Sequence, residues 1–217
     1  MLDISVQRVR ALVHAGELAT AGIPGRSILI TEEAVLGATA NRGHQGRVFT
    51  PPNALAALTM LSGLQTGWIN AKQRYSIRQT LLGCDVDKLM RLTRKRGTVH
   101  RYWASATMLE RMRADRRLRP SGACPQVAKH LGLAPNGTFE AYVDAGLLAE
   151  MTDRYFLSSE DAQPNVRLHA VVGLRGDGPM PLGVCALDLA ESMDIRERSA
   201  GRQCLFNMLS RFKEPTR

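Results

Sequence analysis

The sequence has few of the features that mark unusual classes of protein. Aromatic residues make up 5% of its 217 residues, hydrophobic residues 44% and charged residues 23%, which excludes intrinsic disorder and low complexity. No apolar run approaches the roughly 18 to 20 residues that a membrane span needs. The opening MLDISVQRVR lacks the apolar stretch of a signal peptide. We therefore expect a cytoplasmic protein of one large or two small domains, with no membrane partner.

Cysteine and histidine are sparse and scattered. The cysteines, Cys84, Cys124, Cys185 and Cys204, lie 40, 61 and 19 residues apart, a spacing that suits neither a zinc site nor a disulfide framework. We expect four buried, reduced thiols. The five histidines lack metal-ligand spacing and accompany no catalytic motif. The titratable residues form no convergent set, so the sequence predicts no metal, no cofactor and no enzyme.

Two segments come close to catalytic motifs without matching them. The sequence GLRGDG at 173–178 follows a predicted strand but lacks the Lys-Ser/Thr of a phosphate loop and the spacing of a dinucleotide fingerprint. Asp85 and Asp87 could hold a metal as in nucleotidyltransferases, yet no Gly-Ser element precedes them. We interpret the first segment as a loop and Asp85 as a helix cap.

Positive charge is concentrated in the middle of the chain. Lysine and arginine number 29 against 20 acidic residues, a formal charge of +9. Residues 1–71 carry +1, residues 72–119 carry +10 and residues 120–217 carry −2. A local field of this sign suits a polyanion or an acidic protein partner. The alternative is that these side chains form the solvated helix faces of an arginine-rich protein.

Residue patterns predict an α+β fold that is mainly helical. After an N-terminal unit (1–40) and a glycine-containing linker (41–50), residues 51–217 form a helical and then mixed α+β effector or partner domain, with a possible subdivision near 120 left open. Apolar periodicity and caps predict helices over 51–62, 71–82, 86–95 and 144–155, and a helix that starts at Ser105 with Met108, Leu109 and Met112 inward. They also predict strands over 98–103, 138–143 and 165–172, and a helix over 183–212 with a break near Asp194.

The N-terminal unit has the layout of a DNA-reading helix followed by a wing. Ser5 can cap a helix whose apolar stripe is Val6, Val9, Leu12 and Val13, and which Gly16 ends. Residues 17–19 are then expected to be extended, 22–25 to turn, and 27–30 to return as a strand. Gln7, Arg8 and Arg10 fall away from the stripe. Gln can bridge adenine and Arg can bridge guanine in the major groove.

These residues resemble the excisionase and MerR-like winged helix-turn-helix. The resemblance covers about residues 2–36, on Ile4–Leu18 (ISVQRVRALVHAGEL) and Ile23–Ile30 (IPGRSILI). It implies double-stranded DNA as partner. Bases would be read by Gln7, Arg8 and Arg10 and phosphates held by Ser5 and Arg26, and the candidate DNA-contact residues are Ser5, Gln7, Arg8, Arg10, His14, Arg26 and Ser27.

One departure from that pattern concerns the start of the chain. The family has a helix of about ten residues before the turn, whereas this sequence begins at Met1. Two explanations stay open: the start is assigned too far downstream, or the motif is truncated and DNA binding is impaired.

A weaker resemblance concerns the C-terminal part. The pattern in 186–192, with Asp194, Arg196–Arg198 and Ala200–Gly201, looks like that of AbiEi-type antitoxins, which repress their own operons and bind a toxin. An ordinary amphipathic helix is the alternative.

Other signs of nucleic-acid binding are slight. Val127–Leu133 begins like a second helix-turn-helix, but the Asn136-Gly137 turn and the alternation after it favour a strand. Tyr75, Tyr102 and Trp103 could stack on bases, yet so few aromatic residues in the basic segment are better interpreted as core.

The sequence as a whole predicts a DNA-binding transcriptional regulator. A more specific form of this prediction is the autorepressing antitoxin of a toxin-antitoxin pair. Whether the protein is a homodimer is left open. The alternative is a protein-protein interaction module whose basic helical middle binds an acidic partner, beside a vestigial DNA-binding helix.

Overall fold

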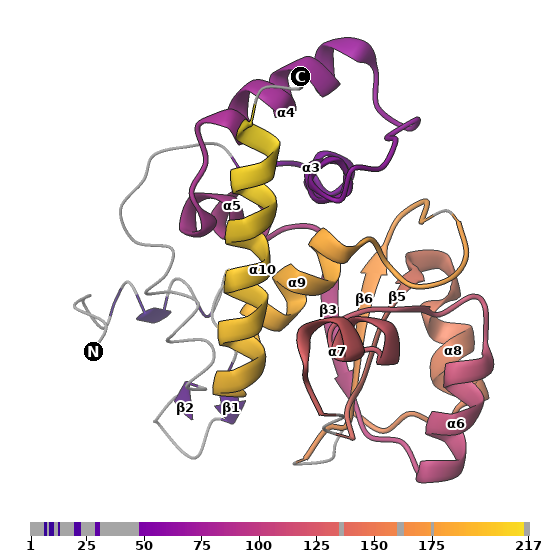
Figure 1. Ribbon diagram of the computed structural model, residues 1–217. Helices are drawn as coiled ribbons and strands as arrows, with labels where there is room; N and C mark the ends of the chain where they lie inside the picture. The colour runs from indigo at the N-terminus through magenta and orange to yellow at the C-terminus, as the bar shows by residue number, and fades with distance from the viewer. Residues whose placement is uncertain are drawn as a thin grey trace. The chain divides into compact units, whose positions relative to one another are not determined.

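The computed structural model describes residues 48–214 apart from 135–136, 160–162 and 175, and in the first 47 residues it describes Gln7, Val9, Arg10, Val13, 20–22 and 29–30. The chain divides into two compact units, Met1–Gly46 and Arg47–Arg217, which are described separately. The fold is α+β, as predicted (Figure 1).

The described part of the first unit consists of helical residues and one strand pair. Gln7, Val9, Arg10 and Val13 are helical. Strand β1 (Thr20–Gly22) pairs antiparallel with β2 (Leu29–Ile30). The predicted cap at Ser5, the predicted end at Gly16, the extended segment 17–19 and most of the turn lie outside the described residues. The winged helix-turn-helix as a whole therefore stays a prediction.

The second unit begins with three helices whose ends follow the predicted caps. Helix α3 (Pro51–Leu61) begins after Thr50, with proline in its first turn. Helix α4 (Ala71–Leu82) begins at a capping box in which Asn70 accepts from the Gln73 backbone and the Gln73 side chain from that of Asn70. Helix α5 (Val86–Thr93) begins where Asp85 accepts from the backbone of Lys88. Side-chain hydrogen bonds thus mark the starts of α4 and α5, and proline marks that of α3.

A four-stranded sheet with the order β3-β6-β5-β4 forms the middle of the unit. The central strands β5 (Phe139–Asp144) and β6 (Val166–Val171) run parallel, while the edge strands β3 (Thr98–Tyr102) and β4 (Arg119–Pro120) pair antiparallel with them. A parallel pair needs a crossover connection, and the chain between β5 and β6 includes the 3-10 turn Ala145–Leu147 and helix α8 (Leu148–Arg154).

The two faces of the sheet meet different partners. Because side chains alternate along a strand, Phe139, Ala141 and Val143 of β5 face one way, with Leu168 of β6, into a cluster that includes residues of α6 (Ala106–Ala114) and α8. Tyr142 and Val171 belong to the other core cluster, together with residues of the helices α3, α4, α5, α9 and α10. This second face also carries the polar side chains described below.

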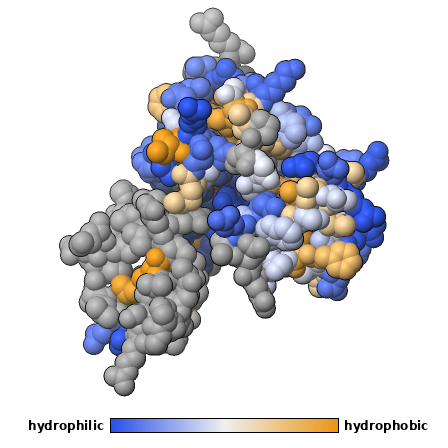
Figure 2. All heavy atoms as spheres, turned by 90° about the horizontal axis from the view of Figure 1, so that it is seen from below, coloured by the Kyte–Doolittle hydropathy of each residue, from blue (hydrophilic) through white to orange (hydrophobic). Residues whose placement is uncertain are grey.

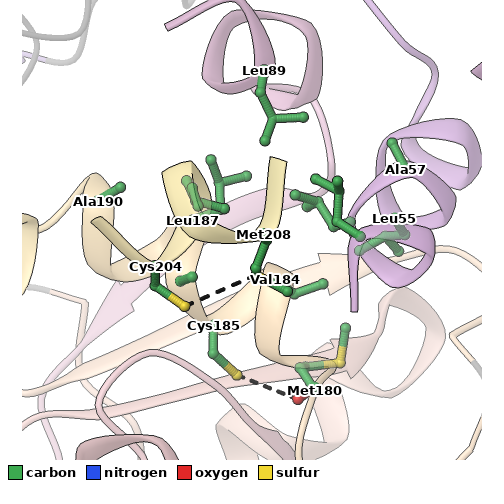
Figure 3. Close-up of a cluster of buried hydrophobic side chains, with 14 of the residues drawn as sticks. Leu55, Ala57, Leu89, Met180, Val184, Cys185, Leu187, Ala190, Cys204 and Met208 are labelled. Atoms are coloured by element: carbon green, nitrogen blue, oxygen red, sulfur yellow. Dashed lines mark hydrogen bonds between the residues drawn. The ribbon is translucent and has the colours of Figure 1, made fainter. Parts of the chain in front are cut away.

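Two C-terminal helices form the centre of the helical core (Figure 3). The helix predicted over 183–212 is in fact α9 (Leu182–Ala190) and α10 (Ile195–Lys213), with Asp194 capping the second at the predicted break. All residues of α9 from Gly183 to Ala190 are buried. Its side chains meet those of α3, α5 and α10, including Leu55, Leu89 and Met208 (Figure 3). Helix α9 is therefore surrounded by the rest of the unit.

The remaining predictions on this unit have mixed outcomes. Helix α7 (Pro125–Leu131) ends at Gly132 in the left-handed conformation, and the next regular element is β5, so no second helix-turn-helix forms there. All four cysteines are buried and free, as expected. Tyr75 is 66% exposed and Trp103 40%, so the prediction that they belong to the core is wrong. Among the described residues, no helix is both long and apolar enough to cross a membrane.

The close contact between α9 and α10 can be tested at Gly201. A β-carbon there would lie 2.4 Å from the backbone nitrogen of Ala190 and 2.5 Å from the carbonyl oxygen of Ala186. We expect Gly201→Ala to lower the free energy of unfolding by about 1–3 kcal/mol or more, because overpacking forces the helices apart. Urea denaturation measures this. Gly67→Ala is the matched control, since nothing lies within 4 Å of its added methyl; an equal effect of both variants would contradict the account.

Candidate functional site

Two of the seven candidate DNA-contact residues lie in the described part of the chain. Gln7 and Arg10 are exposed helical residues, whereas Val9 and Val13 of the predicted apolar stripe are half-buried. The other five, Ser5, Arg8, His14, Arg26 and Ser27, lie outside the described residues. Where the helix is described, its polar side chains are thus more exposed than its apolar ones.

The basic segment of residues 72–119 spans several elements. Its exposed cations include Lys72 of α4, Arg94 and Lys95 after α5, and Arg111 and Arg113 of α6. Arg117 instead pairs with Asp115 at 2.7 Å and Glu150 at 2.6 Å, and Arg96 is 3% exposed. Some cations of the basic segment are therefore buried or paired with carboxylates, and the others are exposed on the surface.

Figure 2 shows one face of the molecule, on which hydrophilic side chains cover much of the second unit and separate hydrophobic patches interrupt them. A surface of this kind fits a solvated charged protein, and it does not select between DNA and an acidic protein as the partner.

A buried polar cluster lies between the sheet and α9. It consists of Arg96 from the turn before β3, Glu140 and Tyr142 of β5, His169 of β6 and Asp188 of α9. These residues are separated by up to 92 positions in the sequence. The prediction that the titratable residues form no convergent set is therefore wrong for them. The alternation of the strands aims Glu140, Tyr142 and His169 at the same face.

The Arg96 guanidinium is the centre of this cluster. It donates from Nη2 to Asp188 at 2.5 Å and to Glu191 at 2.6 Å, and from Nε to the Tyr142 hydroxyl at 2.8 Å. Tyr142 in turn donates to Asp188 at 3.1 Å, and the Ser121 hydroxyl donates to the second oxygen of Asp188. Both oxygens of the buried carboxylate therefore accept hydrogen bonds, as a buried charge requires.

The charges of the cluster keep the Arg96 guanidinium protonated. Burial acts to lower the pKa of Arg96, but the negative charge of Glu191 and the groups Tyr142 and Asp188 outweigh it and raise that pKa. Burial, assisted by Asp188, raises the pKa of Tyr142 although Arg96 opposes it, so Tyr142 keeps the proton that it donates.

Glu140 forms the second half of the cluster. Its Oε1 lies 2.8 Å from Nε2 of His169 and 3.3 Å from Nη1 of Arg167. Burial acts to raise the pKa of Glu140, but the hydrogen bond to His169 and the charge of Arg167 outweigh it, so the pKa is lowered. The His169 ring also stacks on Tyr142, with centroids 4.4 Å apart, and its Nδ1 is buried without a hydrogen-bond partner among the described residues.

Glu140, His169 and Asp188 could be considered as metal ligands, because one ligand atom of each lies within 4.8 Å of the others. The Asp188 carboxylate is already engaged, however: its oxygens accept from Arg96, Tyr142 and Ser121. A divalent cation would have to sit beside the Arg96 guanidinium. His169 and Asp188 are also deeply buried, with 2% and 1% of their surface exposed. The arrangement fits a hydrogen-bonded link between sheet and helix.

The C-terminal pattern that resembles AbiEi-type antitoxins has a structural use at several positions. Asp188 and Glu191 hold Arg96, Asp194 caps α10, and Gly201 permits the contact with α9. Sequence reasoning overlooked Arg96 itself. The signal that could have found it is Asp188, an acid in the otherwise apolar stretch LGVCALDLA, since such a buried carboxylate requires a cation.

Comparisons with known proteins add no relative. No family model matches the chain, and neither a curated protein nor a solved structure matches it. The resemblance to winged helix-turn-helix regulators therefore rests on the N-terminal residues alone.

The link through Arg96 can be tested with Asp188→Asn. Removing one partner of a buried ion pair leaves an uncompensated charge, so we expect the free energy of unfolding to fall by about 3–5 kcal/mol. The control is Glu191→Gln, because the Glu191 side chain is 37% exposed and water can replace it. Chemical denaturation of both variants decides: equal losses would mean that the buried carboxylate is not the essential partner.

The lowered pKa of Glu140 predicts a pH dependence. Because its folded pKa lies below the unfolded value of about 4.5, the ionised Glu140 stabilises the fold above that pH, and the contribution is lost as the pH falls further. We expect the free energy of unfolding of Glu140→Gln to fall less steeply below about pH 4.5 than that of the wild type. Denaturation curves at a series of pH values measure this, and parallel profiles would refute it.

Proposed function

We propose that the protein is a DNA-binding transcriptional regulator that acts in the cytoplasm and contacts double-stranded DNA through its N-terminal helix. The observation that carries this proposal is the placement of Gln7 and Arg10, which are exposed, on a helical segment whose Val9 and Val13 are half-buried. A groove-reading helix needs this division into a polar outer face and an apolar inner face.

The chemistry of the exposed face suits base recognition. A glutamine amide can donate to and accept from the edge of adenine, and an arginine fork can donate twice to guanine. Gln7, Arg8 and Arg10 would take these roles, while Ser5 and Arg26 would hold phosphates, with His14 and Ser27 nearby in sequence. The antiparallel pair β1 and β2 supports a wing, and Arg26 comes between the two strands in the sequence.

The exposed cations of the second unit support a general attraction to DNA. Lys72, Arg94, Lys95 and Arg113 are exposed, and each cation that contacts a phosphate releases counterions and makes affinity dependent on salt. Such contacts carry no sequence information. Specificity is therefore assigned to the N-terminal helix and general affinity to the surface of the second unit.

In the antitoxin form of this proposal, the second unit binds a toxin. The protein then binds DNA as a homodimer. Its support is the sequence resemblance at 186–201. Asp188, Glu191, Asp194 and Gly201 already have structural uses within this chain, so these residues by themselves do not indicate a toxin contact.

The test is a selection of duplexes from a random library by the full-length chain, followed by titration of the preferred duplex and a scrambled one. Each correct bidentate contact contributes about 1–3 kcal/mol of discrimination. We expect Arg8→Ala with Arg10→Ala to reduce the preference by at least about ten-fold and to bring the two duplexes close to equal affinity.

The matched control for this experiment is Arg113→Ala with Arg116→Ala, which removes two exposed charges from the second unit. It should weaken binding to both duplexes and flatten the dependence on salt, with the preference unchanged. A preference that survives in the Arg8/Arg10 double variant would overturn the assignment.

The alternative function is a protein-protein interaction module. Its support is the exposure of arginines together with the aromatic side chains Trp68 and Tyr75, which are 49% and 66% exposed, because aromatic residues and arginine are enriched where proteins bind one another. Failure of the library selection to yield any preferred duplex would favour this alternative.

A further inference from the structure

A cavity of about 590 Å³ lies in the second unit, and its lining contains no residue of the buried cluster. Its walls come from α3, from the loop between α3 and α4, from the end of β6 and from the loop before α9. Most of its lining is apolar and includes Leu55, Leu64, Trp68, Val171, Leu174 and Met180. The polar lining residues include Thr59, Gln65 and Arg119. A volume of this size and a mainly apolar lining are typical of small-molecule sites.

The cavity presents apolar surface to solvent. Leu64 is 54% exposed and Trp68 is 49% exposed, although both line the cavity. The Trp68 indole donates to the carbonyl of Pro52 at 3.2 Å, which fixes the orientation of its ring. A fixed aromatic ring can bind an apolar group at little cost in conformational entropy, so the apolar part of a ligand would lie against Trp68.

Arg119 places a positive charge in this apolar wall. Its Nε donates to the carbonyl of Gly178 at 3.2 Å and its Nη2 to that of Pro179 at 3.1 Å. These bonds hold the guanidinium in place before any ligand arrives. Burial lowers the pKa of Arg119, and the charge of Asp177 opposes this only in part. An anion in the cavity would therefore be attracted more strongly than by a fully hydrated cation.

The glycine-rich segment 173–178 explains how the loop reaches Arg119. Gly173, Gly176 and Gly178 all have φ between +69° and +83°, a conformation that other residues rarely adopt. A β-carbon on Gly176 would lie 3.4 Å from Nη1 of Arg119. The glycines therefore let the backbone fold closely over the guanidinium, and Gly173 and Leu174 complete the cavity wall. The glycines of this segment, which the sequence predicts to be a loop, thus serve to bring the backbone close to Arg119.

We propose that this cavity binds a small organic carboxylate with an apolar body, whose body lies against Trp68 and Leu55 and whose carboxylate lies beside Arg119. A neighbouring hollow that shares Pro52, Val171 and Val172 with the cavity is bordered by Arg94 and Lys95, and these cations add to the positive potential. The proposal concerns the second unit alone and is independent of DNA binding.

Trp68 itself supplies the signal for the test. The chain has two tryptophans, so Trp103→Phe leaves Trp68 as the sole indole of the full-length chain. Decanoate, decan-1-ol and decylamine serve as probes with the same apolar chain and a negative, neutral or positive head. We expect saturable changes in Trp68 emission, with decanoate bound at least about ten-fold more tightly than decan-1-ol because of the charge-assisted contact, and with decylamine bound most weakly.

Variants at Arg119 separate charge from shape. In the Trp103→Phe background, Arg119→Gln should reduce the affinity for decanoate about ten-fold and leave that for decan-1-ol unchanged. Arg119→Lys keeps the charge and should retain most of the affinity for decanoate. Arg113→Gln removes an exposed charge of α6, which does not line the cavity, and should change neither affinity. Circular dichroism confirms that each variant is folded.

The proposal is overturned if decanoate causes no saturable change, if decanoate and decan-1-ol bind equally, or if folded Arg119→Gln and Arg119→Lys bind decanoate as the parent does. None of these results bears on the duplex selection, because that experiment tests the sequence preference assigned to the N-terminal helix.

Discussion

The fold of the second unit depends on one buried cation. Arg96 follows two exposed basic residues, Arg94 and Lys95, but it is turned inward and 3% exposed. Its bonds to Tyr142 of the sheet and Asp188 of α9 link the sheet to the helix on the face that carries Tyr142. Such an interaction specifies geometry more than it adds stability, because desolvation offsets most of the attraction. The position of α9 against the sheet thus follows from the partners of Arg96.

That constraint also limits the chemistry of the unit. The buried titratable residues of the unit have partners within the fold. Glu140 contacts His169 and Arg167, and Asp188 contacts Arg96 and Tyr142. They are used in holding the sheet to the helices. The open parts of the unit lie elsewhere, in the exposed cations and in the apolar cavity beside Arg119, so binding functions are to be sought there.

Local features of the fold were predictable from the sequence, and long-range ones were not. The predicted cap at Asp85 and the predicted break near Asp194 coincide with helix starts, because a cap acts within four residues. The joining of Arg96 to Asp188 was missed, because nothing in the local pattern distinguishes Arg96 from Arg94. The cavity was missed for the same reason: its walls come from α3 and β6, which lie far apart in the sequence. The outward placement of Gln7 and Arg10 agrees with the predicted apolar stripe.

The central claim is that the N-terminal helix lies against DNA bases while the second unit contributes general attraction. Photo-crosslinking tests it most directly, with a benzophenone amino acid placed at position 7 in one chain and at position 113 in another, each bound to a selected duplex. The account predicts that crosslinks from position 7 map to bases within the preferred sequence and that those from position 113 are few and unrelated to sequence. Sequence-mapped crosslinks from position 113 with none from position 7 would contradict it.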